Sequence, residues 1–230
     1  MARKRRIWIY LLAIISVLMI LTNSCKKSST LPPQETITDA DGNVYHTITI
    51  GTQVWTVENL KTTKFTNGDP IPNVTDTTAW ENLTSGAYCD HHGDSIFAET
   101  YGKLYNWYAV SDARKITPFG WHVATDAEWA TMVTYLGGLT VAGGHLKESG
   151  LVHWPNPNIG ADNTSGFTAL PGGYRNDLGE FNPLASGYWW TSTWNGVDGA
   201  WSWNMSYLSA GLVRADAAWK YGYSVRLMKD

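Results

Sequence analysis

The feature that most constrains this chain is a short apolar segment near its start. Four basic residues lie within positions 3–6, and an apolar run follows from Ile7 to about Leu21, broken only by Ser16. A basic start, an apolar stretch and small residues before a cysteine are typical of a secretory signal. A spanning helix needs about 20 apolar residues, so the shorter run favours cleavage. We therefore expect residues 1–25 to be a signal peptide.

The cysteine after this run predicts the type of signal. The segment before Cys25 resembles the relaxed lipobox of Bacteroidota-type lipoproteins, although Thr22 stands where leucine is usual. The resemblance implies that Cys25 is lipidated and anchors the protein to the bilayer, which several acyl chains do stably. The alternative is an uncleaved signal anchor with an incidental cysteine. Because Lys26 follows, with no retention aspartate and no acidic export tag, we expect the outer membrane, on its periplasmic face or at the cell surface.

The part of the chain after the leader is acidic and has one cysteine. Residues 1–25 hold four of the 17 Lys and Arg and none of the 20 Asp and Glu, which leaves 13 basic against 20 acidic residues. Nucleic acid is not an expected partner, because it binds basic surfaces. Cys89 alone cannot close an internal disulfide, so a hydrophobic core must hold the fold, and about 190 residues suffice for one.

The chain after Cys25 divides into a tether and one domain. Residues 26–38 are polar, contain Pro32–Pro33 and are expected to form a flexible tether. Residues 39–43 have the composition of a turn. Apolar and polar residues then alternate over 44–50, which predicts a strand, and Gly51-Thr52 predicts a hairpin into a second strand over 53–57.

Local signals also predict helices and later strands. Thr125 and Glu128 form a capping box before a helix whose apolar face includes Trp129 and Val133, and Gly137-Gly138 ends it. A second helix is expected over 100–113. Beyond Gly143, long loops rich in Gly, Asn, Pro and Trp alternate with expected strands at 188–193, 200–207, 211–215 and 223–228. This order predicts an α+β domain.

Ordered motifs from residue 39 to residue 230 resemble the Fibrobacter succinogenes major paralogous domain, a family of exported and often lipidated bacterial proteins. The motifs are DGNVY at 41–45, Trp55 with ENLKT at 58–62, YGKLYNWYAV at 101–110, GWHV at 120–123, TDAEW at 125–129, GFTALPGGYR at 166–175, YWWTST at 188–193 and SVR at 224–226. The family in turn resembles the C-type lectin-like fold shared with formylglycine-generating enzymes. The resemblance implies short helices packed on small twisted antiparallel sheets with long irregular loops.

The resemblance also implies one difference. Relatives often carry two cysteines where this chain has Thr117 and Leu227. If these cysteines form a disulfide in relatives, this chain lacks a crosslink that typically contributes about 2–4 kcal/mol.

The residues favour binding over catalysis. No Gly-x-Ser-x-Gly elbow occurs. Cys89 lies near His91 and His92, but we interpret it as a small buried apolar residue rather than a nucleophile, and one cysteine cannot replace the copper-binding pair of formylglycine-generating enzymes. We therefore expect no enzyme activity.

No metal or cofactor is expected either. Adjacent histidines point in different directions, which argues against zinc at 91–94. Residues 39–43 begin like a calcium loop, but Ile50 stands where such a loop needs glutamate. Calcium bound by long loops stays open, with oxygen-bearing candidates at Asp162, Asn163, Asn195, Asp198 and Asn204. The Glu-Pro-Asn sugar motif of calcium-dependent lectins is missing.

Tryptophan is the most unusual component. The chain has 13, five of them between 189 and 203. Indoles suit sugar faces and protein hot spots, but core packing is the favoured interpretation for this group as a whole, with Trp189 or Trp190 inside. We also expect four other tryptophans in the core: Trp55, Trp107, Trp121 and Trp129. The hypothetical ligand site consists of Trp194, Asn195, Asp198, Trp201, Trp203 and Asn204.

Together these features predict an envelope-anchored lipoprotein with a non-catalytic binding domain. Its expected partners are the lipid bilayer, through Cys25, and a glycan or an envelope protein. Two alternatives stay open: a structural or adhesive surface protein without a small-molecule site, and an enzyme with an unrecognised carboxylate or metal centre.

Overall fold

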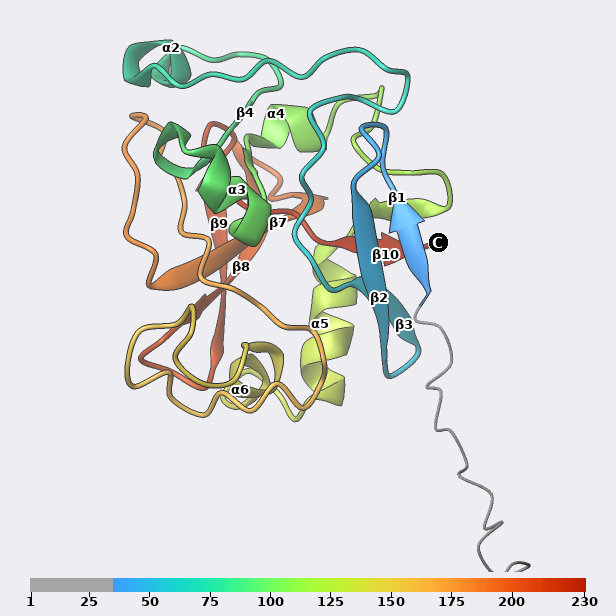
Figure 1. Ribbon diagram of the computed structural model, residues 1–230, viewed down its shortest axis with the longest axis vertical. Coiled ribbons are helices and arrows are strands. Elements are labelled where there is room, and N and C mark those ends of the chain that lie inside the picture. The colour runs from blue at the N-terminus through green and yellow to red at the C-terminus, as the bar shows by residue number, and fades with distance from the viewer. Residues whose placement is uncertain (1–34) are drawn as a thin grey trace, which may run out of the picture. The chain divides into compact units, whose positions relative to one another are not determined.

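The hairpin predicted around Gly51 forms the middle of a five-stranded antiparallel sheet (Figure 1). The computed structural model describes residues 35–230, so the leader, Cys25 and most of the expected tether lie outside the described residues. The sheet has the order β1-β2-β3-β10-β6. Its strands are β1 (Thr36–Thr38), β2 (Val44–Ile50), β3 (Gln53–Thr56), β10 (Leu227–Lys229) and β6 (Trp121–Val123).

Strand β1 corrects the expected boundary of the tether. Thr36 pairs with His46 and Thr38 with Val44, and the N–H of Thr47 donates to the Glu35 carbonyl at 3.0 Å. The outer edge of β2 offers main-chain groups that need partners, and the threonines before Asp39 have high β propensity. Residues 36–38, which the sequence placed in the tether, therefore belong to the sheet.

A second sheet of three antiparallel strands contains most of the tryptophan-rich segment. Its order is β7-β8-β9, and the strands are β7 (Ser186–Trp194), β8 (Gly199–Ser206) and β9 (Leu212–Ala218). Two short strands, β4 (Tyr88–Cys89) and β5 (Leu104–Tyr105), form a separate pair. The strands expected at 188–193, 200–207 and 211–215 are confirmed, whereas the last expected strand is regular only over its final residues.

The best-predicted helix is confirmed together with its cap. Helix α5 (Asp126–Tyr135) begins after Thr125, whose hydroxyl accepts from the Glu128 N–H, while the Glu128 carboxylate accepts from the Thr125 N–H. The remaining helices are short: α2 (Thr77–Glu81), η1 (His91–Gly93), α3 (Ser95–Tyr101), α4 (Trp107–Val110) and α6 (Ala142–Leu146). No helix in the described part of the chain has the length and apolar character to span a membrane.

The single helix expected over 100–113 is wrong. Helix α3 ends at Tyr101, because Gly102 adopts a φ of +77° and packs so closely against Asn59 that a Cβ would lie 2.6 Å from its side chain. The chain then forms β5 and starts again at α4, where the buried Asn106 side chain accepts from the Ala109 N–H. A tight contact with a distant residue thus overrides the local pattern.

The β7-β8-β9 sheet is covered on both faces, so both neighbouring tryptophans of β7 are buried. Trp189 packs in a cluster with α5, and Trp190 packs in a second cluster with Tyr105 and Tyr223. Trp55, Trp121 and Trp129 are also core residues, as predicted, whereas Trp107 is only partly buried.

Three buried cationic side chains donate hydrogen bonds to main-chain carbonyls, mostly in the long loops. They are Lys147, Arg175 and Arg226. Burial lowers the pKa of Lys147 to about 8 and that of Arg226 to about 9. None of the three side chains has an acidic hydrogen-bond partner within residues 35–230. Their main-chain acceptors are Ile159, Ser206 and Ser209 for Lys147, Val74, Thr75 and Gly179 for Arg175, and Thr56, Phe167 and Thr168 for Arg226.

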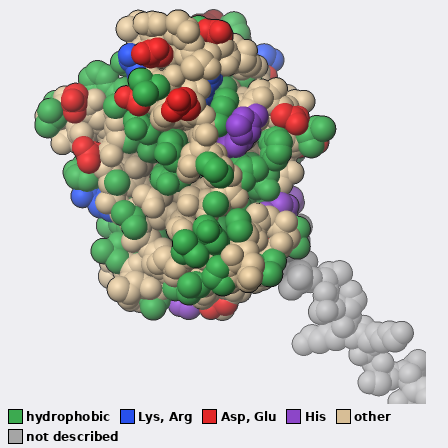
Figure 2. Space-filling model, turned by 90° about the vertical axis from the view of Figure 1, so that its left-hand side faces the viewer, with side chains coloured by type: hydrophobic (Ala, Val, Ile, Leu, Met, Phe, Trp, Pro, Cys, Tyr) green, Lys and Arg blue, Asp and Glu red, His purple; other side chains and the backbone are tan. Residues whose placement is uncertain are grey.

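These cations stabilise the irregular loops, because they donate to main-chain carbonyls that have no partner in a sheet. A buried carbonyl without a donor costs about 1–3 kcal/mol, and each of the three cations donates to three main-chain carbonyls. The side of the domain seen in Figure 2 has acidic side chains gathered toward the end that carries α2, and hydrophobic side chains distributed among polar ones. Positive charge is thus used inside the fold while negative charge is prominent on this face.

Candidate functional site

The β7-β8 hairpin carries the predicted ligand residues, but its register separates them. Trp201 pairs with Asp216 of β9, and Trp203 pairs with Arg214. Trp194 pairs with Ala200, beyond a bulge that follows Trp190. Because successive side chains of a strand alternate between faces, Trp201 and Trp203 lie on one face of the sheet, whereas Trp194 and Asn204 lie on the other. The six residues do not form one continuous surface.

Trp203 belongs to the core, so its predicted ligand contact is wrong. The side chain is 2% exposed and stacks on Trp129, with ring centroids 6.2 Å apart and an interplanar angle of 12°. Its indole N–H donates to the Asp126 carboxylate at 3.1 Å. The position faces α5, which the sequence pattern of β8 alone does not reveal.

Asn195 shapes the turn between β7 and β8. Its side-chain oxygen accepts from the N–H groups of Val197 at 2.9 Å and Gly199 at 3.1 Å, and its amide donates to Asp216 at 3.3 Å. These bonds occupy the side-chain oxygen within the turn, so the Asn195 side chain is not free to hydrogen-bond a ligand. Asp198 is exposed on the same turn.

Trp201 is half-buried beneath an arginine. The Arg214 guanidinium carbon lies 3.3 Å from the centre of the Trp201 ring. Arg214 is held by Asp126 through its Nε and Nη2 atoms, with a shortest distance of 2.7 Å. One face of the Trp201 indole is therefore already covered, which leaves Trp194, 53% exposed, as the accessible indole of the predicted set.

A concave site lies next to β7. This β7 cleft has a volume of about 290 Å³ and is formed by residues 110–117, β6 and β7. Its buried lining is mostly apolar, and its exposed rim is mostly polar. The buried part consists of Val110, Ile116, Thr117 and Val123, and the rim of Ser111, Asp112, Ala113, Lys115, His122 and Ser192. Sequence reasoning did not find this site, because its walls come from segments far apart in the chain.

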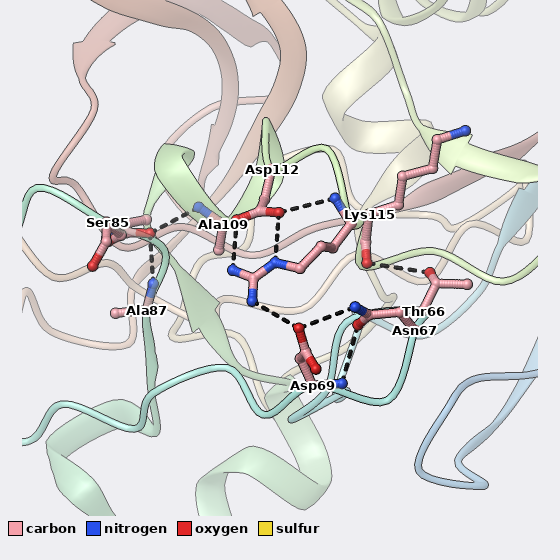
Figure 3. Close-up of polar contacts among 10 residues, drawn as sticks. Thr66, Asn67, Asp69, Ser85, Ala87, Ala109, Asp112 and Lys115 are labelled. Carbon is pink, nitrogen blue, oxygen red and sulfur yellow. Dashed lines mark hydrogen bonds and ion pairs between the residues drawn. The ribbon is translucent and has the colours of Figure 1, made fainter.

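An arginine clamp fixes the loop that forms one wall of the β7 cleft (Figure 3). Arg114 binds Asp112 at 2.9 Å and Asp69 at 3.1 Å. The hydroxyl of Thr66 donates to the Lys115 carbonyl at 3.2 Å. Figure 3 shows the Lys115 side chain extending away from these contacts, and its ammonium has no hydrogen-bond partner in the described part of the chain. These contacts hold the loop in place, while the Lys115 ammonium is available to bind a ligand.

His122 lies at the rim of the cleft between two carboxylates. Its Nδ1 lies 2.6 Å from Asp230, and its Nε2 lies 3.0 Å from Glu128. Burial opposes the charge, but the hydrogen bonds to Asp230 and Glu128 outweigh it and raise the pKa of His122. Because both ring nitrogens are engaged by carboxylates, the imidazole is not placed to accept a proton from a serine on the rim.

Aromatic side chains flank β7 beside the cleft. The indole N–H of Trp107 donates to the Thr191 carbonyl at 3.0 Å, one residue before Ser192. Trp107 stacks on Trp219 with centroids 6.0 Å apart, and Tyr108 meets the Trp219 ring edge-on at 5.7 Å. All three are partly exposed. We call this group the aromatic shelf; neither Tyr108 nor Trp219 was predicted as a site residue.

The calcium candidates do not meet. Asp162 bonds to His145 and Thr164, and the Asn163 amide donates to the Thr168 hydroxyl, while the other candidates lie on the β7-β8 hairpin. Residues 35–230 contain no group of three or more His, Cys, Asp or Glu side chains placed to hold a metal ion.

The thiol of Cys89 is buried in the core. Burial raises its pKa to about 12. This matches the interpretation of Cys89 as a small core residue.

Comparison with known proteins gives one match. No curated protein and no solved structure matches the chain. A family model described as the Fibrobacter succinogenes major domain matches residues 48–229. This range contains the capping box of α5, the tryptophans of the β7-β8 hairpin and the walls of the β7 cleft, and it covers well over half of the chain. The protein therefore belongs to the Fibrobacter succinogenes major domain family.

Proposed function

We propose that this protein is an envelope-anchored lipoprotein whose domain binds a glycan without catalysing a reaction. The observation that carries the proposal is the β7 cleft beside exposed aromatic side chains. Ligand sites are typically concave and mostly apolar, with a few polar groups that fix orientation, and this cleft has that character. Its volume of about 290 Å³ suits a small group such as one sugar unit.

The chemistry of the site supports a sugar ligand. Indole rings stack on the apolar faces of sugar rings, and Trp194 lies two residues beyond Ser192 along β7, or about 7 Å. The hydroxyls of Ser111 and Ser192 and the ammonium of Lys115 offer donors at the rim. His122 is already held by two carboxylates, which favours a binding role over proton transfer.

The architecture is consistent with the C-type lectin-like relationship, which forms part of the same proposal. Small antiparallel sheets, short helices and long loops are present. The loops form much of the cleft wall, as expected of a binding module in which loops carry function on a rigid scaffold.

The proposal is tested with a glycan array followed by titration calorimetry on the strongest hit. Ser192→Phe fills the cleft, and Trp194→Ala removes the exposed indole. Val197→Ala is the matched control, because Val197 is 74% exposed on the same hairpin and lies outside the cleft lining. We expect each of the first two changes to weaken binding by about tenfold or more, equivalent to about 1.4 kcal/mol.

Two results would count against the proposal. One is binding that all three variants leave unchanged. The other is a domain that binds envelope proteins but no glycan, which would favour an adhesive or structural role.

A further inference from the structure

Strand β9 forms the outer edge of the β7-β8-β9 sheet. It pairs with β8 through seven consecutive residue pairs, from Gly199 with Ala218 to Met205 with Leu212, without a register shift. Among the described residues, no strand pairs with its other side. An edge of this kind presents unpaired N–H and C=O groups that can bind another strand.

The register identifies the main-chain groups that face outward. The Ser202 hydroxyl donates to the Ala215 carbonyl at 3.0 Å, so Ala215 faces β8. The Leu212 N–H donates to the Leu139 carbonyl at 2.8 Å, so Leu212 faces away from β8. Because these directions alternate along a strand, the main-chain groups of Arg214 and Asp216 also face outward, and no segment within 35–230 pairs with them.

Strand β9 lacks most of the features that usually prevent edge pairing, and its two charged residues, Arg214 and Asp216, have opposite signs. Natural edge strands are often short, bulged, or interrupted by proline or by a lysine that repels a second strand. Strand β9 has seven residues, a regular register and neither proline nor lysine. Val213 is 57% exposed, and Arg214, Asp216 and Ala218 are exposed as well.

We propose that β9 pairs antiparallel with β9 of a second copy of this chain, about a two-fold axis at Ala215. In this register Arg214 lies opposite Asp216 of the second copy, and Asp216 lies opposite its Arg214. Both residues have outward-facing main-chain groups, so these two positions form the hydrogen-bonded pairs of the ladder. Ala215 lies opposite its own copy and has a small side chain that allows close approach.

Charge complementarity selects a second copy as the occupant. Arg214 uses Nε and Nη2 to hold Asp126, and its Nη1 has no hydrogen-bond partner in its own chain, as far as the structure describes it. Asp216 accepts one long bond, of 3.3 Å, from Asn195. Two-fold pairing brings these groups together twice. Opposite charges directly across a ladder are favourable, whereas like charges are not.

The ends of β9 limit the ladder to its central residues. At Leu212, the edge is already occupied by the Leu139 carbonyl. In the proposed register Leu212 lies opposite Ala218 of the second copy, where β9 ends, so the two do not compete. The dimer therefore pairs Val213–Ala217 and joins the two three-stranded sheets into one of six strands. This inference is independent of the proposed ligand, because it uses neither the β7 cleft nor the aromatic shelf.

The dimer is tested with the full chain in mild detergent by sedimentation and by light scattering. The unsubstituted chain should show twice the mass of one chain, with dissociation on dilution. Asp216→Pro should give one chain mass, because it removes an outward N–H donor, while proline is tolerated on an edge strand. Asp216→Ala, the matched control, keeps the N–H and should keep the dimer, since exposed ion pairs contribute little. Near-ultraviolet circular dichroism confirms that each variant is folded.

An engineered disulfide tests the register. Residues in a non-hydrogen-bonded antiparallel pair have Cα atoms about 4.5 Å apart, within the range of a disulfide. Ala215→Cys should therefore crosslink two chains on oxidation, and peptide mapping should find position 215 of one chain joined to position 215 of the other. Ala217→Cys, which faces Val213 of the second copy, should not crosslink. A chain that is monomeric at every concentration, a dimer that survives Asp216→Pro, or equal crosslinking at both positions would overturn the proposal.

Discussion

Lys147 shows how a single side chain can organise several loops. It is fully buried, and its ammonium donates to three carbonyls, at 3.0 Å to Ile159, 3.0 Å to Ser206 and 2.7 Å to Ser209. Replacing both members of a buried polar pair can be neutral, but removing only the donor leaves the acceptors unsatisfied. The conformation of the surrounding loops therefore depends on the Lys147 ammonium, even though burying this charge costs free energy.

We predict that Lys147→Met lowers the free energy of unfolding by about 1–3 kcal/mol, because three partly buried hydrogen bonds to main-chain carbonyls are lost while the volume is nearly conserved. Urea unfolding followed by tryptophan fluorescence measures the change. Lys115→Met is the matched control: Lys115 is exposed and its ammonium is unbonded within the described chain, so its effect should stay within about 0.5 kcal/mol. Equal effects of the two substitutions would contradict the role assigned to Lys147.

Among the secondary-structure elements, His122 links its own strand β6 to the next helix, α5, and to the distant end of β10. The side chain projects from β6 and contacts Glu128 in the first turn of α5 and Asp230 just after β10. Its pKa is raised, because the two carboxylates outweigh the opposing effect of burial. A histidine with a raised pKa stabilises the folded state fully below its unfolded pKa of about 6.5. This contribution is lost as the pH rises through the folded pKa.

We predict that His122→Gln destabilises the protein most near pH 6, and that the difference from the unsubstituted protein shrinks as the pH rises above the folded pKa. Urea unfolding at a series of pH values between about 5.5 and 9 measures this trend. His92→Asn is the control, since His92 is exposed and bonds to no carboxylate of the described residues. A difference for His122→Gln that does not vary with pH would show that the carboxylate contacts do not govern its charge.

The same elements show what the sequence could predict. Helix α5 and the β2-β3 hairpin were predicted because their signals are local: a capping box, an apolar face and a glycine turn. The helix expected over 100–113 failed because Gly102 and Asn106 serve contacts with distant segments. Similarly, the irregularity after Trp190 shifts the pairing of β7 by two residues, so that Trp194 rather than Ser192 lies opposite Ala200, and no periodicity in β7 predicts this shift.

At the scale of the whole molecule, sites assembled from distant segments are the hardest to predict. The β7 cleft combines residues 110–117, β6 and Ser192, and the buried cations bind carbonyls far away in the chain. Composition did indicate the abundance of tryptophan, but it could not distinguish Trp203 in the core from Trp194 at the surface. The family, in contrast, was predictable, because its motifs are short and keep their order.

The expected anchoring of the whole molecule depends on one sulfur atom, that of Cys25. If Cys25 carries the acyl chains, Cys25→Ser removes the membrane affinity that several chains provide, and the protein should move from the membrane to the soluble fraction. Mass spectrometry of the unsubstituted protein should find acylated Cys25 at the N-terminus. Cys89→Ala is the control, because Cys89 lies in the core, and it should leave the protein in the membrane fraction. If the leader is instead an uncleaved signal anchor, Cys25→Ser stays membrane-bound and an intact Met1 is found, which would contradict lipidation.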